Sequence, residues 1–187
     1  MNYQRFVCWG DSQTFGARTY GCYPLYLVRE LNASTRYRWS VINLSSNGHT
    51  ARDLWFRIGR ESSRLHDCYR ACVMIGANDV ANETPVNLFH EYYAQLLDTL
   101  AIAGVRIVHC GEITPFFADG HSFFPRESVS RRDEYNDAMR EAVDACAVAV
   151  RVEFPDLTAD CFVDPAHLSE EGNRVVAAGF AASIRST

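Results

Sequence analysis

Five short apolar runs, separated by longer stretches with helical patterning, constrain the fold of this chain more than any other feature. Each run is rich in β-branched or aromatic residues, which is typical of strands buried on both faces of a parallel sheet. Strands and helices that alternate in this way favour an open α/β sheet with right-handed crossovers. Sheets of this kind place their functional sites beyond the carboxyl ends of the strands. The predicted strands are 5–9, 39–44, 71–75, 105–110 and 148–154.

Proline, glycine and capping residues predict where most of the intervening helices begin and end. Proline is tolerated in the first turn of a helix, and glycine often follows the last residue. Ser130 and Asp133 have the spacing of a capping box, and Ser169 is placed to cap the last helix. A further segment, containing Leu54, Trp55, Ile58 and Leu65, follows helical spacing only loosely. The predicted helices are 24–31, 85–103, 135–147 and a last segment that ends near residue 184.

Composition restricts the partners that we expect. The length of 187 residues fits a single domain over 1–187, and the net charge of −5 argues against nucleic acid as a partner. No apolar run is long enough for an integral membrane segment, and no secretory signal precedes the first strand. The odd number of cysteines, seven, most of them in apolar runs, favours a reducing, cytoplasmic compartment. Cys68 and Cys72 lack a second pair of ligands, so we expect no metal site. We expect no other cofactor either.

A serine follows the first predicted strand and could act as a nucleophile. In Gly10-Asp11-Ser12-Gln13-Thr14 the hydroxyl of Ser12 would emerge at the carboxyl edge of the sheet. Serine is a weak nucleophile unless a base removes its proton, so a histidine must come from elsewhere in the chain. The alternative interpretation is an ordinary turn in which Asp11 and Ser12 cap a helix.

The base and the oxyanion donors have candidates in three other loops. Asp164 and His167 are three residues apart, which lets the carboxylate orient the ring; Asp156 and Asp160 are rival carboxylates without such a histidine. Gly48 and Asn78, after the second and third strands, could donate hydrogen bonds to an oxyanion. Taken singly, each of these motifs is also common in turns and helix caps.

The ordered set of Gly-Asp-Ser, Gly48, Gly-x-Asn-Asp and Asp-x-x-His resembles the SGNH hydrolases, also called GDSL-type esterases and lipases. The likeness extends from Gly10 to the last helix. It implies a three-layer, flavodoxin-like α/β sandwich around a five-stranded parallel sheet. It also implies a triad of Ser12, His167 and Asp164, and an oxyanion hole formed by the Ser12 and Gly48 amides and the Asn78 side chain. Gln13 departs from the family motif, which has Leu at this position.

An aromatic loop after the fourth strand is a candidate for the substrate pocket. It contains four phenylalanines, which either pack as a satellite core or form the wall of an acyl or aryl pocket. Residues that follow the nucleophile could form the opposite rim, where an arginine and a tyrosine would also suit a sugar or a carboxylate-bearing substrate. The candidate pocket residues are Arg18, Tyr20, Phe116, Phe117, His121, Phe123 and Phe124.

These observations predict a serine esterase or acylhydrolase that cleaves small carboxylic esters, with short acyl groups, through an acyl-enzyme. The expected substrate is an acylated sugar, a lipid or an aryl ester. One alternative is a carbohydrate- or small-ligand-binding module that kept the fold and lost turnover. Another is a flavin-binding protein, although no dinucleotide or phosphate-binding glycine motif is present.

Overall fold

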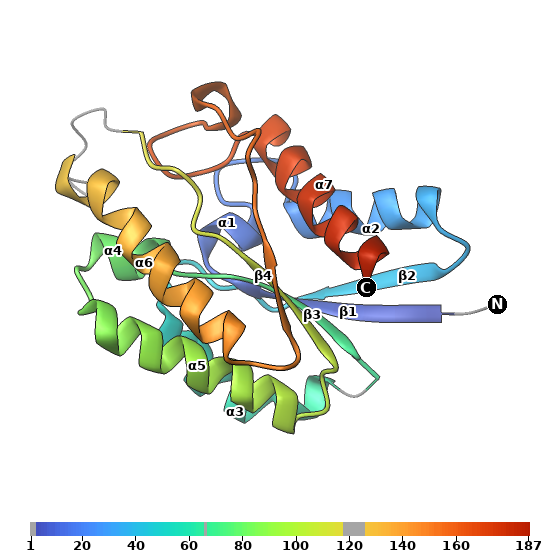
Figure 1. The fold of residues 1–187 in the computed structure, drawn as a ribbon. Coiled ribbons are helices and arrows are strands. Elements are labelled where there is room, and N and C mark those ends of the chain that lie inside the picture. The colour runs from blue at the N-terminus through green and yellow to red at the C-terminus, as the bar shows by residue number, and fades with distance from the viewer. Residues whose placement is uncertain (1–2, 66, 118–125) are drawn as a thin grey trace.

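The computed structural model describes residues 3–65, 67–117 and 126–187, which contain a five-stranded sheet with every neighbouring pair parallel (Figure 1). The strand order is β2-β1-β3-β4-β5, so β1 lies between β2 and β3. This confirms the predicted α/β class. The strands are β1 (Tyr3–Gly10), β2 (Arg38–Asn43), β3 (Arg70–Met74), β4 (Ile107–Gly111) and β5 (Ala149–Val152).

Helices cover both faces of the sheet, which explains why the strands are apolar throughout (Figure 1). Because side chains alternate along a strand, Val7 and Trp9 of β1 enter one core and Phe6 and Cys8 enter the other. The first core is closed by α3 (Ala51–Glu61), α5 (Val86–Ile102) and α6 (Arg126–Asp144). The second is closed by α2 (Tyr23–Ser34) and α7 (Glu170–Ser186).

Local signals located three of the long helices well, α2, α5 and α7, and misplaced the start of α6. Ser169 caps α7 by accepting a hydrogen bond from the Gly172 amide at 3.2 Å, as predicted. The helix predicted from Ser130 and Asp133 begins instead at Arg126, so Ser130 lies inside α6 and does not cap it. This helix also ends at Asp144, before the predicted residue 147.

The loosely patterned segment after β2 is helix α3, and a capping box fixes its start. The Thr50 hydroxyl accepts from the Asp53 amide, and the Asp53 carboxylate accepts from the Thr50 amide. The apolar residues Leu54 and Ile58, one helical turn apart, are buried against the sheet. Thr50 and Asp53 have capping-box spacing in the sequence, so the start of α3 could have been predicted from them despite the irregular apolar spacing.

Two short helices follow strand ends and shape the carboxyl edge of the sheet. Helix α1 (Ser12–Phe15) begins two residues after β1, and α4 (Ala77–Ala81) begins three residues after β3. Two 3₁₀ turns, η1 (Ser62–Leu65) and η2 (Ala159–Cys161), complete the described elements. Among the residues described, no helix has both the length and the apolar character needed to cross a membrane.

Candidate active site

The turn after β1 presents Ser12 at the first position of α1. The Asp11 carboxylate caps this helix by accepting the Gln13 amide at 2.9 Å. A side chain at Gly10 would overlap Thr14 and the Met74 carbonyl, so this tight turn requires glycine. Asp11 is buried, and burial raises the pKa of its carboxyl to about 7. Asp11 therefore caps a helix, as the alternative interpretation of the sequence expected of Asp11 and Ser12, whereas Ser12 is not the cap but the first residue of α1, two residues after the carboxyl end of β1.

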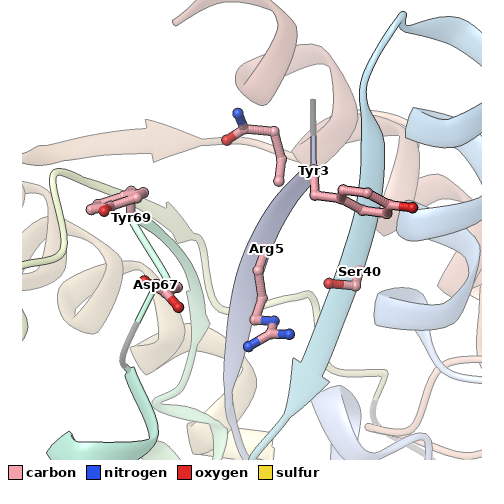
Figure 2. Close-up of a pocket in the computed structure, with 6 residues that line it drawn as sticks. Tyr3, Arg5, Ser40, Asp67 and Tyr69 are labelled. Atoms are coloured by element: carbon pink, nitrogen blue, oxygen red, sulfur yellow. The ribbon is translucent and has the colours of Figure 1, made fainter. Parts of the chain in front are cut away.

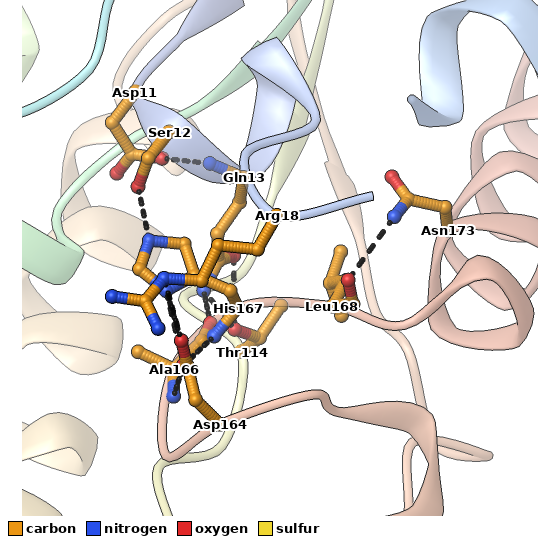
Figure 3. Close-up of polar contacts among 10 residues, drawn as sticks. All are labelled: Asp11, Ser12, Gln13, Arg18, Thr114, Asp164, Ala166, His167, Leu168 and Asn173. Carbon is orange, nitrogen blue, oxygen red and sulfur yellow. Dashed lines mark hydrogen bonds and ion pairs between the residues drawn. The ribbon is translucent and has the colours of Figure 1, made fainter. Parts of the chain in front are cut away.

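Ser12, His167 and Asp164 form a connected row of hydrogen bonds (Figure 3). Nε2 of His167 lies 3.1 Å from Oγ of Ser12, although the two residues are 155 positions apart in the chain. On the other side of the ring, Nδ1 lies 2.8 Å from Oδ2 of Asp164. A carboxylate only accepts hydrogen bonds, so the neutral ring carries its proton on Nδ1 and leaves Nε2 free to accept one from Ser12.

A tight loop holds Asp164 against the histidine. Oδ1 of Asp164 accepts the backbone amides of Ala166 at 3.0 Å and His167 at 2.8 Å. Partial burial alone would raise the pKa of the Asp164 carboxyl, but these hydrogen bonds and the contact with His167 outweigh it, so the net pKa is lowered. The carboxylate consequently stays ionised and keeps the ring oriented.

The two candidate oxyanion donors, Gly48 in the loop after β2 and Asn78 in helix α4, lie on segments that are joined to each other. Gly48 is exposed and has a φ of 78°, and the Ser46 amide donates to the Gly10 carbonyl at 3.0 Å, which holds this loop beside the Ser12 turn. The side chain of Asn78 is largely buried and donates from Nδ2 to the His49 carbonyl at 2.9 Å. An amide group carries two N–H bonds, so one of them is left for a ligand. The structure thus brings the Gly48 loop and Asn78 together.

Asp79 fixes the start of α3, directly after the loop that contains Gly48. Its side chain is fully buried, and Oδ2 accepts the Ala51 amide at 2.9 Å. Burial is the main reason that the pKa of this carboxyl is raised to about 7, and the nearby charge of Asp11 adds to the effect. Asn78 binds the His49 carbonyl and Asp79 binds the Ala51 amide, so the segment that follows Gly48 is held at two points.

Gln13, the residue at which the sequence departs from the family motif, links three loops of the site. Its Nε2 donates to Oγ1 of Thr114 at 2.7 Å and to the Ala166 carbonyl at 2.6 Å (Figure 3). Oγ1 of Thr114 in turn lies 3.0 Å from Oε1 of Gln13, and all three residues are buried. Neither Gln13 nor Thr114 was predicted to be a site residue. The replacement of the usual Leu by an amide was the signal available.

The predicted pocket residues fall in different environments. Arg18 is exposed and lies 3.1 Å from Oδ2 of Asp164 through Nε, whereas Tyr20 is fully exposed. Phe116 is buried in the first core, and Phe117 stacks edge-on against Phe162 with ring centroids 5.0 Å apart. The remaining candidates, His121, Phe123 and Phe124, lie outside the described residues.

A separate pocket of about 390 Å³ lies at the opposite edge of the sheet (Figure 2). Tyr3 and Arg5, at the amino end of β1, form part of its wall together with Ser40 and Tyr69. Ser12 follows the carboxyl end of the same strand. This pocket is therefore separate from the Ser12 site.

One known protein family matches most of the chain, including the segments that carry Ser12 and His167. The sequence profile of the GDSL-like Lipase/Acylhydrolase family matches residues 8–175. A sequence search of curated proteins found no match.

Solved structures similar to this chain include esterases and an acylhydrolase. The aryl esterase of M. Smegmatis aligns with a TM-score of 0.83 at 16% identity, over 98% of this chain and 99% of that one. The carbohydrate acetylesterase Est24 from Sinorhizobium meliloti gives 0.82 at 13% identity, over 98% and 99%. The lipase/acylhydrolase from Enterococcus faecalis gives 0.79 at 20% identity, over 98% and 96%. At these identities the structural likeness concerns the fold.

Proposed function

Because this chain belongs to the GDSL-like lipase/acylhydrolase family and is a carboxylic ester hydrolase, we propose that it works through Ser12 as nucleophile and an acyl-enzyme intermediate. The observation that carries the proposal is the row of hydrogen bonds from Ser12 through His167 to Asp164. The substrates are small-molecule carboxylic esters.

In the first step Oγ of Ser12 attacks the ester carbonyl while Nε2 of His167 takes the hydroxyl proton. The positive charge that develops on the ring is stabilised by Asp164, whose lowered pKa keeps it ionised. His167 then donates this proton to the departing alcohol oxygen as the C–O bond of the ester breaks. The acyl group remains attached to Ser12.

In the second step water attacks the acyl-enzyme, with His167 again acting first as base and then as acid. Water adds to the acyl carbonyl, the bond to Oγ breaks, and the proton on His167 returns to Ser12. The products are the carboxylic acid and the regenerated enzyme.

The negative charge on the carbonyl oxygen in both steps would be held by the amides of Ser12 and Gly48 and by the side chain of Asn78. The free N–H bond of the Asn78 amide supports this role, as does the anchoring of the Gly48 loop. Donors fixed before the reaction need no reorganisation as the charge develops, which makes them effective in stabilising the transition state.

We further propose that the acyl group is short. Phe116 is turned into the core, where its ring cannot line an acyl channel, and a carbohydrate acetylesterase is among the proteins that share the fold. A series of p-nitrophenyl esters from acetate to decanoate tests this preference: turnover should fall as the chain lengthens. A maximum at decanoate would contradict a short acyl pocket.

The nucleophile is tested by Ser12→Ala, with Ser62→Ala as the matched control because Ser62 is exposed at the far end of α3. We expect Ser12→Ala to lose nearly all p-nitrophenyl acetate hydrolysis and all labelling by a fluorophosphonate probe. The control should retain both. Wild-type turnover by Ser12→Ala would refute Ser12 as the nucleophile.

A further inference from the structure

Arg18 places a cation beside the imidazole of His167 (Figure 3). Its Nε lies 3.1 Å from Oδ2 of Asp164, and Nδ1 of His167 lies 2.8 Å from the same oxygen. Two nitrogens that approach one oxygen this closely must be neighbours. The Arg18 side chain is 65% exposed, so its guanidinium lies at the edge of the site where a ligand could contact it.

The contact with Asp164 leaves most of the guanidinium unused. The ion pair with Asp164 is formed through Nε, and within the described ranges Nη1 and Nη2 of Arg18 form no hydrogen bond. Asp164 also does not depend on Arg18 for its position, because it already accepts two backbone amides and the His167 ring. The two terminal nitrogens therefore remain available as a pair of parallel donors, the geometry that suits a carboxylate.

The backbone at Arg18 favours a functional role over a merely structural one. Its φ of 65° is left-handed, a conformation that costs a non-glycine residue roughly 1–2 kcal/mol. The surrounding loop imposes this conformation, since the Thr19 hydroxyl donates to the Gly16 carbonyl at 3.1 Å and also to the Gly21 carbonyl. Glycine or asparagine would adopt this conformation at a lower cost, so the backbone at this position does not favour arginine.

The proposed reaction decides which part of a substrate Arg18 would meet. The alcohol oxygen must receive its proton from Nε2 of His167, so the alcohol portion lies on the histidine side of the scissile bond. The carbonyl oxygen points the other way, toward Asn78 and Gly48. Arg18 stands on the histidine side and would therefore contact the alcohol.

We propose that Arg18 selects esters whose alcohol portion carries a carboxylate; this inference rests on the function proposed above. The Nη donors of Arg18 bind that carboxylate while Nε stays on Asp164. In the ground state Arg18 and Asp164 neutralise each other. When His167 becomes positively charged, the group of three carries a net positive charge, so an anionic alcohol is favoured most strongly in the transition state.

The test compares two esters that differ in this charge, 4-acetoxybenzoate and the uncharged 4-acetoxybenzamide. The quantity measured is the ratio of their kcat/KM values in the wild type and in Arg18→Gln. Any effect of the substitution transmitted through Asp164 applies to both esters and cancels in the ratio. Arg29→Gln, which removes an exposed arginine on α2, is the control for net charge.

We expect Arg18→Gln to lower the preference for the charged ester about tenfold, the lower end for a hydrogen bond to a charged group at an exposed position. Arg18→Lys keeps the charge but not the two parallel donors, so its preference for the charged ester should lie between those of the wild type and Arg18→Gln. Arg29→Gln should match the wild type. An unchanged ratio in Arg18→Gln, or an equal loss in Arg29→Gln, would overturn the inference. Loss of 4-acetoxybenzamide hydrolysis in Ser12→Ala shows separately whether the proposed nucleophile holds.

Discussion

Replacing Gln13 by Leu, the residue that the family motif has at this position, tests how far the three linked loops depend on one buried amide. The substitution removes the hydrogen bonds to Thr114 and to the Ala166 carbonyl. Both partners are buried, so neither gains water in exchange. A buried polar group that loses its partner costs about 1–3 kcal/mol.

The Thr114 hydroxyl and the Ala166 carbonyl are the two groups that would lose a partner, and together they set the size of the destabilisation. The apolar side chain of Leu offsets part of this loss. Burying a leucine side chain contributes roughly 1.5–3 kcal/mol, although here it replaces a side chain that is already buried and of similar length. We therefore expect Gln13→Leu to lower the free energy of unfolding by about 2 kcal/mol. The loss should appear as a lower urea midpoint at unchanged slope.

The double variant Gln13→Leu/Thr114→Val separates the hydrogen bonds from packing. Replacing both partners by apolar groups of similar shape can be nearly neutral, so the double variant should be more stable than the sum of the single variants predicts. Urea unfolding followed by the fluorescence of the three tryptophans measures all four proteins. Additive single and double losses, or a Gln13→Leu protein as stable as the wild type, would refute the network as a source of stability.

Two further expectations concern the oxyanion donor and a buried histidine. Asn78→Ala should reduce kcat for p-nitrophenyl acetate about 100- to 1,000-fold with little change in KM, and a loss below fivefold would remove Asn78 from the oxyanion hole. His109 is fully buried, and burial, aided by the charge of Arg70, lowers the pKa of its ring to about 3. Between pH 6.5 and 3 the unfolded chain therefore binds a proton at His109 that the native protein does not, so the free energy of unfolding decreases as the pH is lowered through this window, by up to about 1.4 kcal/mol per pH unit. The difference in unfolding free energy between the wild type and His109→Gln should follow that slope from pH 6.5 to 4, and a difference that stays constant with pH would show that His109 is not the titrating group.

The strands and the positions of the site loops could be predicted because both follow from local patterns and one geometric rule. Buried parallel strands must be apolar on both faces, and their carboxyl ends must share one edge. Ser12 and His167 could therefore be assigned to the same place although they are far apart in the sequence.

Features that depend on side-chain direction or on the preceding chain could not be predicted in the same way. Ser130 and Asp133 have the spacing of a cap, yet the chain before them is already helical from Arg126. Thr50 and Asp53 have the same spacing and form a true cap, because Thr50 is extended. The contact between the Gln13 side chain and the Ala166 carbonyl joins segments from opposite ends of the chain and depends on the Gln13 rotamer, which no local pattern records.

The order of the strands has a consequence for how such a protein can diversify. From β1 the chain passes to α2 on one face of the sheet, whereas from β3 it passes to α5 on the other face. The two connections diverge between neighbouring strands, so Ser12 lies beside a topological switch point, the position at which open α/β sheets bind ligands. Insertions or replacements in the later connections could then reshape the ligand-binding rim during evolution while the framework beneath the nucleophile stays the same.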